Sequence, residues 1–336
     1  MSVPIINTPN GLLFPVKFLG KGSFGAVYLY QTYANVLLPP TYHVCKFFYP
    51  IAKKVKSIHN EINVMNNIYK LLDGCHEYLI CHTSKLEIPP SNDYYQDIFN
   101  FLKTHSREIL DPTISIYGYI SNYIEGPELS KYIFNSQEDC ANYITQLFDA
   151  LCILHSKGIV HSDIKPENIV FNDKIQKFVI IDFGLSCIYP QEKSLTHKQL
   201  LVRDEVSTSC SRSTDIRGTA LYTPNKLIHA RASANKQGKV LTSNERKFQD
   251  IYGVMVSLFK LINYTYPYNT IIINNRYFSD ERTYKQSETS FPLIDKILNY
   301  FFDTYLYNDY NYVCNLFTAE TCIPLFENVL KFNFNT

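Results

Sequence analysis

The spacing of apolar residues changes near residue 125, and this change limits what the chain can fold into. Before it, short apolar runs bounded by turn residues predict strands over 12–19, 26–30 and 42–48. After it, apolar residues recur mainly every three or four positions, which is typical of helices. We therefore expect an α+β fold, with a small sheet region followed by a larger helical region.

Three helices can be predicted from the apolar spacing. The first interrupts the sheet region behind Ser57, a candidate N-cap, and its apolar repeat consists of Ile58, Ile62, Met65, Tyr69 and Leu72. The second should open at the capping-box pattern Ser136-x-x-Asp139 and end before Gly158. The third, over 250–262, is apolar on nearly every side and should be buried all round.

Composition excludes several classes of partner. The 336 residues are 46% apolar, which is enough to bury a large core. Lysine plus arginine (32) nearly equals aspartate plus glutamate (31), so we expect no bulk attraction to nucleic acid or membranes. No apolar stretch approaches membrane-spanning length, and the N-terminus lacks a basic segment followed by an apolar run. We expect an intracellular, cytoplasmic protein with reduced thiols, with the nucleus or a virion as alternatives.

One grouping of cysteine and histidine could suggest a metal site. Cys75-His76 and Cys81-His82 are separated by more residues than the two to four that usually divide paired zinc ligands. We therefore favour a loop with free thiols over a zinc site.

A glycine-rich run extends from Gly20 to Gly25 with the spacing G-x-G-x-x-G. Such a run also occurs in dinucleotide sites, where it leads into a helix. Here the following residues, 26–30, are rich in β-branched and aromatic side chains and predict a strand. A glycine loop between two strands can close over phosphate oxygens without side-chain clashes.

Lys46 lies on the third predicted strand, and Glu61 follows on the first predicted helix. A lysine there could reach the phosphates of a nucleotide held under the glycine loop, although a single lysine on a strand is more often an ordinary surface residue. Glu61 lies beside the apolar face of its helix and could pair with Lys46. The two residues together favour a nucleotide site.

The strongest chemical motif runs from His161 to Asn168, with the sequence HSDIKPEN. A short strand, 178–181, separates it from Asp182-Phe183-Gly184. The order of glycine loop, strand lysine, helix glutamate, H-x-D-x-K-x-x-N and D-F-G resembles the protein kinase family, from about residue 13 to 262.

The resemblance implies a bilobal, protein-kinase-like fold. Its N-lobe, residues 1–122, should contain a small antiparallel sheet with one main helix and an insertion at about 74–112. Its C-lobe, residues 123–336, should be larger and mainly helical. The family uses ATP with Mg²⁺, or Mn²⁺ as an alternative, and phosphorylates protein substrates.

The resemblance also assigns catalytic roles. Asp163 would accept the hydroxyl proton of the acceptor, supported by Lys165 and Thr219. Asn168 and Asp182 would hold the metal ions. The lysine two residues after the catalytic aspartate is the form found in serine/threonine kinases, whereas His161 is expected to pack as a structural residue.

Nucleotide-binding roles follow from the same resemblance. Lys46, fixed by Glu61, would hold the α- and β-phosphates under a loop that consists of Leu19, Gly20, Lys21, Gly22, Ser23, Phe24, Gly25, Ala26 and Val27. Cys45 is expected on the adenine face opposite Val27. The backbone of Asn122 and Ile124 would face adenine, Glu128 would lie near the ribose and Ser121 would occupy the gatekeeper position.

Three departures limit the resemblance. Ser162 replaces the arginine that usually pairs with a phosphorylated activation loop, so we expect activity without that phosphorylation. Asn225 stands where a glutamate normally anchors the segment, so the anchor must differ here. A long polar loop at 193–215 is either a mobile insertion or an autophosphorylation site.

The non-arginine at position 162 and the altered motif around Pro224 resemble the casein kinase one and vaccinia-related branch, or a divergent viral member. Two alternatives to an active protein kinase are a pseudokinase that binds ATP or acts as a scaffold, and a small-molecule kinase.

Overall fold

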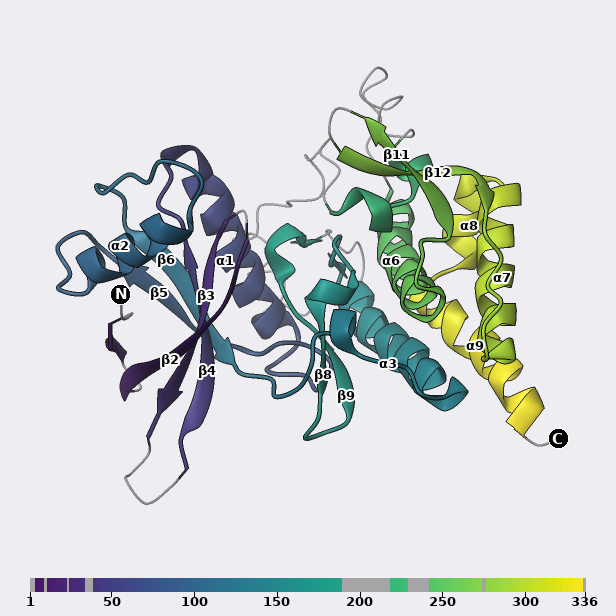
Figure 1. The fold of residues 1–336 in the computed structure, drawn as a ribbon, viewed down its shortest axis with the longest axis horizontal. Helices are drawn as coiled ribbons and strands as arrows, with labels where there is room; N and C mark the ends of the chain where they lie inside the picture. The colour runs from purple at the N-terminus through teal and green to yellow at the C-terminus, as the bar shows by residue number, and fades with distance from the viewer. Residues whose placement is uncertain are drawn as a thin grey trace. The chain divides into compact units, whose positions relative to one another are not determined.

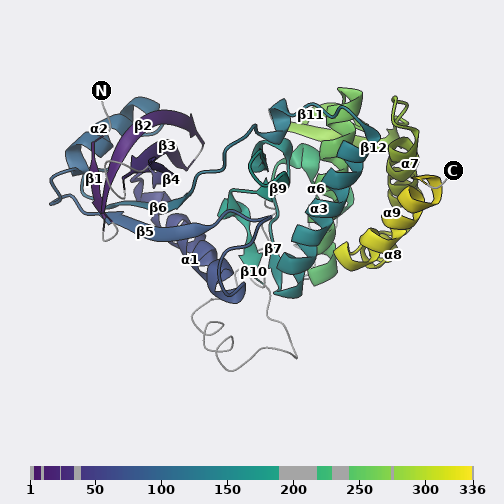
Figure 2. The same cartoon turned by 90° about the horizontal axis from the view of Figure 1, so that it is seen from below.

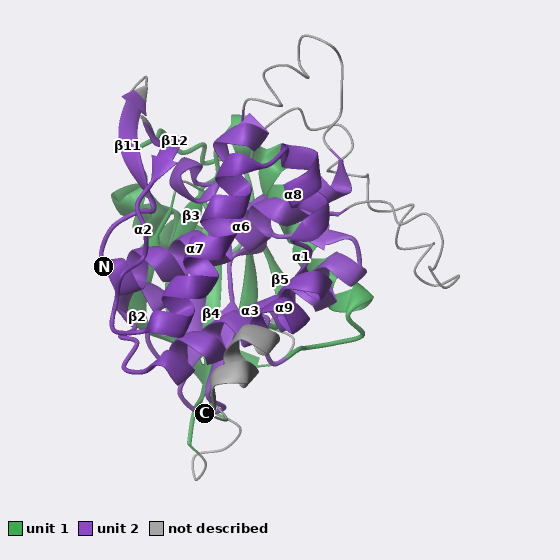
Figure 3. Ribbon diagram, turned by 90° about the vertical axis from the view of Figure 1, so that its right-hand side faces the viewer, with its two compact units in different colours: residues 1–76, 80–124 green, residues 77–79, 125–336 purple. Residues whose placement is uncertain are grey.

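A computed structural model of the chain describes residues 4–8, 11–22, 24–33, 39–188, 218–228, 242–273 and 276–334. It divides into two compact units (Figure 3). The first comprises Met1–His76 and Ile80–Ile124, and the second comprises Glu77–Leu79 and Glu125–Thr336. The division therefore follows Ile124, close to the expected boundary after residue 122, and the second unit also takes three residues from the predicted insertion.

The first unit contains a six-stranded antiparallel sheet in the order β1-β2-β3-β4-β6-β5 (Figure 1). Its strands are β1 (Ile6–Thr8), β2 (Gly11–Lys21), β3 (Gly25–Thr32), β4 (Thr41–Phe48), β5 (His82–Ile88) and β6 (Ile116–Asn122). Its helices are η1 (Ala52–Lys54), α1 (Val55–Leu71) and α2 (Tyr95–His105). The three predicted strands of this region correspond to β2, β3 and β4.

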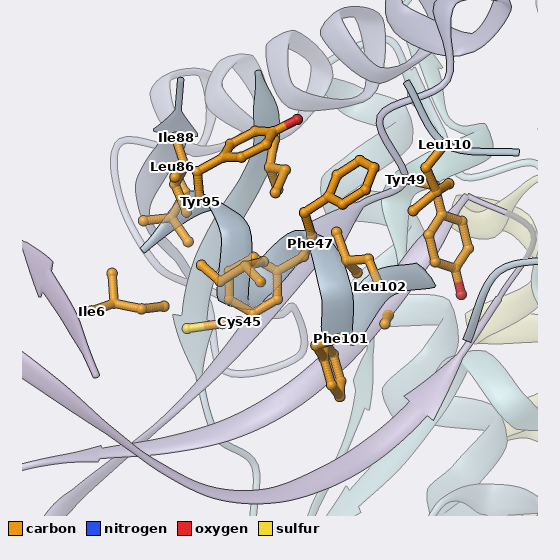
Figure 4. Packing of buried hydrophobic residues seen from close by; sticks show 14 of the residues in the cluster. Ile6, Cys45, Phe47, Tyr49, Leu86, Ile88, Tyr95, Phe101, Leu102 and Leu110 are labelled. Atoms are coloured by element: carbon orange, nitrogen blue, oxygen red, sulfur yellow. The ribbon is translucent and has the colours of Figure 1, made fainter. Parts of the chain in front are cut away.

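Helix α2 covers one face of the sheet and builds the main core of this unit (Figure 4). Cys45, Phe47 and Leu102 of the helix belong to the same buried cluster, and all three are fully buried. The predicted main helix corresponds to α1, and α2 is an additional helix that was not predicted from the sequence. The helix was missed because it lies in a segment read as an insertion, although its apolar residues are spaced as on a buried helical face.

Helix α1 begins at Val55, earlier than the sequence suggested. Its N-cap is Lys54, which makes no side-chain capping bond, so the expectation that Ser57 caps this helix is wrong. The preceding turn, η1, already directs the chain into the helix and no capping side chain is used there.

The second unit holds most of the helices and several short strands (Figure 1). Its helices are α3 (Gln137–Ser156), α6 (Ser243–Asn263), α7 (Pro292–Tyr307), α8 (Tyr310–Leu316) and α9 (Ala319–Phe334). Its strands are β7 (Ile159–Val160), β8 (Ile169–Asn172), β9 (Lys177–Ile180), β10 (Cys187–Ile188), β11 (Tyr268–Ile273) and β12 (Arg276–Tyr284). Its short 3₁₀ turns are η2 (Leu129–Lys131), η3 (Pro166–Asn168), η4 (Phe183–Leu185) and η5 (Ala220–Tyr222).

Helices α3 and α6 lie side by side in the second unit (Figure 2). Ser136 caps α3, since its hydroxyl accepts the Asp139 N–H, which confirms the predicted start of this helix. Residues 250–259 of α6 are all buried, as expected, whereas Lys260 and Leu261 near the end of the predicted run 250–262 are partly exposed. Both helices contact β7, which leads directly into the residues from His161 onward.

Cys75 and Cys81 are joined by a disulfide, and their Cα atoms are 5.1 Å apart. The expectation of free thiols in this loop is therefore wrong for these two residues, because their backbones approach within bonding range of a disulfide. The remaining cysteines found as free thiols are Cys45, Cys140, Cys152, Cys314 and Cys322.

Among the residues that the structure describes, no helix is both long enough and apolar enough to cross a membrane.

Candidate active site

In the first unit, Lys46 and Glu61 form a close ion pair. The Lys46 Nζ lies 2.6 Å from Glu61 Oε1, and the two side chains are only 12% and 4% exposed. Lys46 also lies 5.3 Å from the ring centroid of Phe48 and 5.7 Å from that of Tyr119. Strand β4 and helix α1 thus fix a lysine ammonium group at a defined position.

The glycine-rich run forms the turn between β2 and β3, where the Gly22 N–H donates to the Gly25 carbonyl at 2.9 Å. A Cβ atom on Gly25 would lie 2.1 Å from the carbonyl oxygen of Phe47 on β4, so only glycine fits there. Among the described residues, no atom lies within 4 Å of a Cβ built on Gly20 or Gly22. Ser23 lies outside the described residues.

Two residues of this loop are bound elsewhere in the first unit. Lys21 directs its Nζ to the carbonyl of His105 at the end of α2, at 3.2 Å. The Phe24 ring lies beneath the ammonium group of Lys54, 5.3 Å from its centroid. The backbone of the loop, rather than these side chains, is therefore the part that could face a phosphate. Leu19, just before the loop, is exposed.

The structure differs from the expected position of Cys45. Strand alternation places Cys45 on the face opposite Lys46, in the core beside α2, and Ala26 shares that face. Val27 pairs directly with Lys46 across the two strands and shares its face. Val44, two residues before Lys46, therefore shares the face of Lys46, which is the face that was expected for Cys45.

Ser121 and Asn122, which are expected at the adenine site, are the last two residues of β6, and Ile124 and Glu128 follow them. Ser121 is buried, and the Asn122 N–H is already bonded to the Cys81 carbonyl at 3.2 Å. Ile124 is the last residue of the first unit. In the second unit, Glu128 accepts from the Lys131 ammonium at 3.2 Å.

In the second unit, the Asp163 carboxylate is held by three neighbouring side chains. Its Oδ1 accepts from the Thr219 N–H at 2.8 Å and from the Thr219 hydroxyl at 2.9 Å. Its Oδ2 lies 2.8 Å from Lys165 Nζ and accepts from Asn168 Nδ2 at 3.0 Å. Lys165 also donates to the Thr219 hydroxyl at 2.9 Å, which closes the group. The structure thus brings together four predicted residues from positions up to 56 apart.

Asp250 of α6 holds the backbone of this loop and was not predicted as a site residue. Its carboxylate accepts from the N–H groups of His161 at 2.9 Å and Ser162 at 2.7 Å, and it is completely buried. Ser162 adopts φ 69°, which is unusual for a residue other than glycine, and its carbonyl accepts from Gln249 at 2.8 Å. A buried aspartate in an otherwise apolar helix was the available sequence signal.

His161 packs as a structural residue. Its Nε2 lies 3.1 Å from the carbonyl of Ile181, and its ring centroid lies 4.9 Å from that of Phe183. The side chain is fully buried, so it connects the loop to the residues around Asp182 without facing solvent.

Asn168 and Asp182 carry oxygen atoms suited to a hard cation. Asn168 uses its amide nitrogen to donate to the Asp163 carbonyl at 2.8 Å as well as to the carboxylate, which leaves its amide oxygen to act as a ligand. Asp182 is exposed and adopts φ 58°, and its Oδ1 accepts from the Gly184 N–H. Carboxylate and amide oxygens are ligands that Mg²⁺ accepts.

Gly218 provides a test of how Thr219 is positioned. Gly218 has φ +106°, and a Cβ there would lie 2.3 Å from the Ser162 carbonyl oxygen. An alanine at 218 would clash with Ser162 and disfavour the positive φ, so we expect Gly218→Ala to displace Thr219. The kcat of the phosphoryl transfer expected from the resemblance should then fall about tenfold or more. Steady-state kinetics would measure this effect.

Gly74→Ala is the matched control for this substitution. Gly74 also has a positive φ, +129°, but an added Cβ would have no atom of the described part of the chain within 4 Å. It should lower stability slightly and leave kcat unchanged. Equal kcat values for wild type and Gly218→Ala would contradict the role given to Gly218.

A family model described as the protein kinase domain matches residues 15–335. Because this match covers nearly the whole chain, the chain belongs to the protein kinase domain family. The ion pair of the first unit and the Asp163 group of the second lie within the matched range.

Several named proteins are similar to this chain. One from Mycoplasma pneumoniae, named as a serine/threonine-protein kinase, is 27% identical over 213 residues, which are 62% of this chain and 50% of that protein. Serine/threonine-protein kinase B of Synechocystis is 26% identical over 175 residues, 52% of this chain and 27% of that protein. A casein kinase II subunit alpha homolog of Encephalitozoon cuniculi is 40% identical over 87 residues, 25% of this chain and 27% of that protein.

The matched regions span half or less of the length of these relatives. Their names refer to bacterial serine/threonine kinases and to casein kinase II. The placement in the casein kinase one and vaccinia-related branch stays a prediction.

Proposed function

We propose that this protein transfers the γ-phosphoryl group of ATP to serine or threonine hydroxyls of other proteins. The observation that carries this proposal is the arrangement around Asp163, whose carboxylate is oriented by Thr219, Lys165 and Asn168. Phosphoryl transfer depends mainly on positioning and on neutralising charge, and a carboxylate held on both oxygens is suited to that task.

Each of these residues would have a separate role. Asp163 would orient the acceptor hydroxyl and take its proton. Lys165, 2.8 Å from the same carboxylate, would place a positive charge near the transferred phosphoryl group. Thr219 would keep Asp163 in one orientation through its two hydrogen bonds.

The nucleotide and metal would be held by groups that the fold already positions. Lys46, fixed by Glu61, would bind the α- and β-phosphates, beneath the backbone of the glycine loop. Asn168 and Asp182 would provide oxygen ligands for Mg²⁺, or for Mn²⁺ in its place. The metal, when bound, would neutralise phosphate charge as the transferred group leaves ADP.

The acceptor class is proposed from two observations. Lys165 follows Asp163 by two residues, the form that resembles serine/threonine kinases, and the relatives cited above carry that activity in their names. The experiment is to incubate the protein with γ-labelled ATP, Mg²⁺ and casein, myelin basic protein or histone, followed by phosphoamino-acid analysis. Label on serine or threonine is expected. Label confined to tyrosine, or no protein label despite ATP binding, would contradict the proposal.

We expect the activity to be independent of activation-loop phosphorylation. Ser162 has no cationic side chain with which to bind a phosphate, and its N–H and carbonyl are already bonded to Asp250 and Gln249. Phosphatase-treated and untreated protein should therefore have the same specific activity in the casein assay. A loss of activity on phosphatase treatment, restored by incubation with ATP, would show that this expectation is wrong.

A further inference from the structure

Residues 218–228 form the segment that carries Thr219. Glu281, on β12, binds this segment at Asn225. Glu281 Oε1 accepts from the Asn225 backbone N–H at 2.9 Å and from the Tyr252 hydroxyl at 2.8 Å. Its other oxygen accepts from the Tyr305 hydroxyl. One partly buried carboxyl group therefore gathers three donors, from the segment, from α6 and from α7.

The side chains of Asn225 and Lys226 also bind β12 and the end of α7. The Asn225 side-chain amide donates to the Ser279 carbonyl on β12. The Lys226 ammonium donates to carbonyls at the end of α7, at 3.3 Å for Leu306 and 3.0 Å for Asn308. A cation at the C-terminal end of a helix is electrostatically favourable.

Burial and hydrogen bonding act in opposite directions on the pKa of Glu281, whose net shift is upward. Burial raises the pKa of the Tyr252 and Tyr305 hydroxyls well above the usual value, so both remain donors at neutral pH. Burial also raises the pKa of the Glu281 carboxyl, while the hydrogen bonds from Tyr305, Asn225 and Tyr252 and the charge of Lys226 oppose that rise. Removing the acceptor would leave three poorly solvated donors without it.

The backbone connects Asn225 to Thr223, from which hydrogen bonds lead to Asp163. Two residues before Asn225, the Thr223 hydroxyl donates to the Thr219 carbonyl at 3.2 Å and accepts from Gln249 at 3.2 Å. Thr219 in turn donates twice to Asp163. Releasing Asn225 would therefore loosen the residue that orients the catalytic carboxylate.

We propose that Glu281 is the positioning residue that anchors this segment, in place of the glutamate that is missing at position 225. Strand β12 supplies the acidic partner and the segment supplies the Asn225 backbone N–H, while Lys226 separately binds carbonyls at the end of α7. The inference rests on the proposed kinase activity for its kinetic consequence, but the anchoring itself can be measured without catalysis.

The test compares Glu281→Gln with Asp280→Asn, a matched control on the same strand. The carboxylate of Asp280 pairs with Arg282, whose Nε lies at 2.7 Å. A glutamine at 281 turns an amide NH₂ toward at least one donor, so we expect faster backbone amide exchange in residues 218–228, measured by mass spectrometry. We expect kcat to fall about tenfold, equivalent to about 1.4 kcal/mol, with an unchanged KM for ATP. Asp280→Asn should change neither quantity.

The outcomes separate the anchor from the activity. Wild-type exchange and wild-type kcat in folded Glu281→Gln would overturn the proposal, as would a rise in KM for ATP without faster exchange in the segment. An inactive wild-type protein would contradict the proposed function, and the exchange comparison would still decide the anchor.

Tyr305→Phe provides a milder variant in case Glu281→Gln does not fold. It removes one donor to Glu281 and leaves the other two. Exchange in the segment should rise by less than in Glu281→Gln but in the same direction. Unchanged exchange in this variant, with Glu281→Gln unable to fold, would also count against the anchor.

Discussion

Asp163→Asn should lower kcat about a thousandfold while ATP still binds, since proton transfer to a positioned group contributes about 10²- to 10⁴-fold. The substitution keeps the size of the side chain, so the bonds from Thr219 to Oδ1 can persist. However, an amide NH₂ at the second position would face the Lys165 ammonium and the Asn168 amide, both of which are donors. Steady-state kinetics and a fluorescent-nucleotide titration would measure the two effects separately.

Asp173→Asn is the control for this prediction. Asp173 is exposed in the turn after β8, and the same chemical change there should leave kcat and ATP affinity unchanged. If Asp163→Asn kept more than about a tenth of the wild-type kcat, a role in proton transfer would be excluded.

Lys46→Met should lower kcat/KM for ATP about 10²- to 10³-fold, the size of effect seen when one preorganised electrostatic contact is removed. Methionine has a similar length but no charge, so it cannot attract phosphate. The variant should also be less stable, by about 3 kcal/mol, because Glu61 is buried and loses its cation. Thermal unfolding and kinetics would be measured on the same preparation.

The double variant Lys46→Met/Glu61→Gln separates these two effects. Replacing the buried carboxylate by an amide should recover much of the lost stability, because no uncompensated charge is left. It should recover none of the activity, since the phosphate-binding charge is still missing. Recovery of both quantities would show that Lys46 matters only for folding.

The parts of the fold that were predicted correctly depend on local signals. The capping residue Ser136 and the buried run in α6 follow from residues close together in the sequence. The strand periodicity also placed β4 correctly, but Cys45 was assigned to the wrong face of it. A one-residue error along a strand exchanges the two faces, which is why Cys45 lies in the core while Lys46 does not.

The features that were missed depend on contacts between distant positions. Nothing local marks Glu281 as a partner of Asn225, because the two are 56 residues apart and are brought together only by the tertiary fold. Asp250 is similar, since its role depends on the backbone of His161 and Ser162. By contrast, the grouping of Asp163 with Thr219 could be predicted, since the resemblance to protein kinases relates those two positions directly.

The most direct test of the central claim is transfer of label from γ-labelled ATP to casein, with wild type, Asp163→Ala and Lys46→Met assayed side by side. The account predicts label on serine or threonine with the wild-type protein and its loss in both variants. Equal labelling in all three samples, or no labelling by a wild-type protein that binds ATP, would contradict the claim that this chain is a protein kinase.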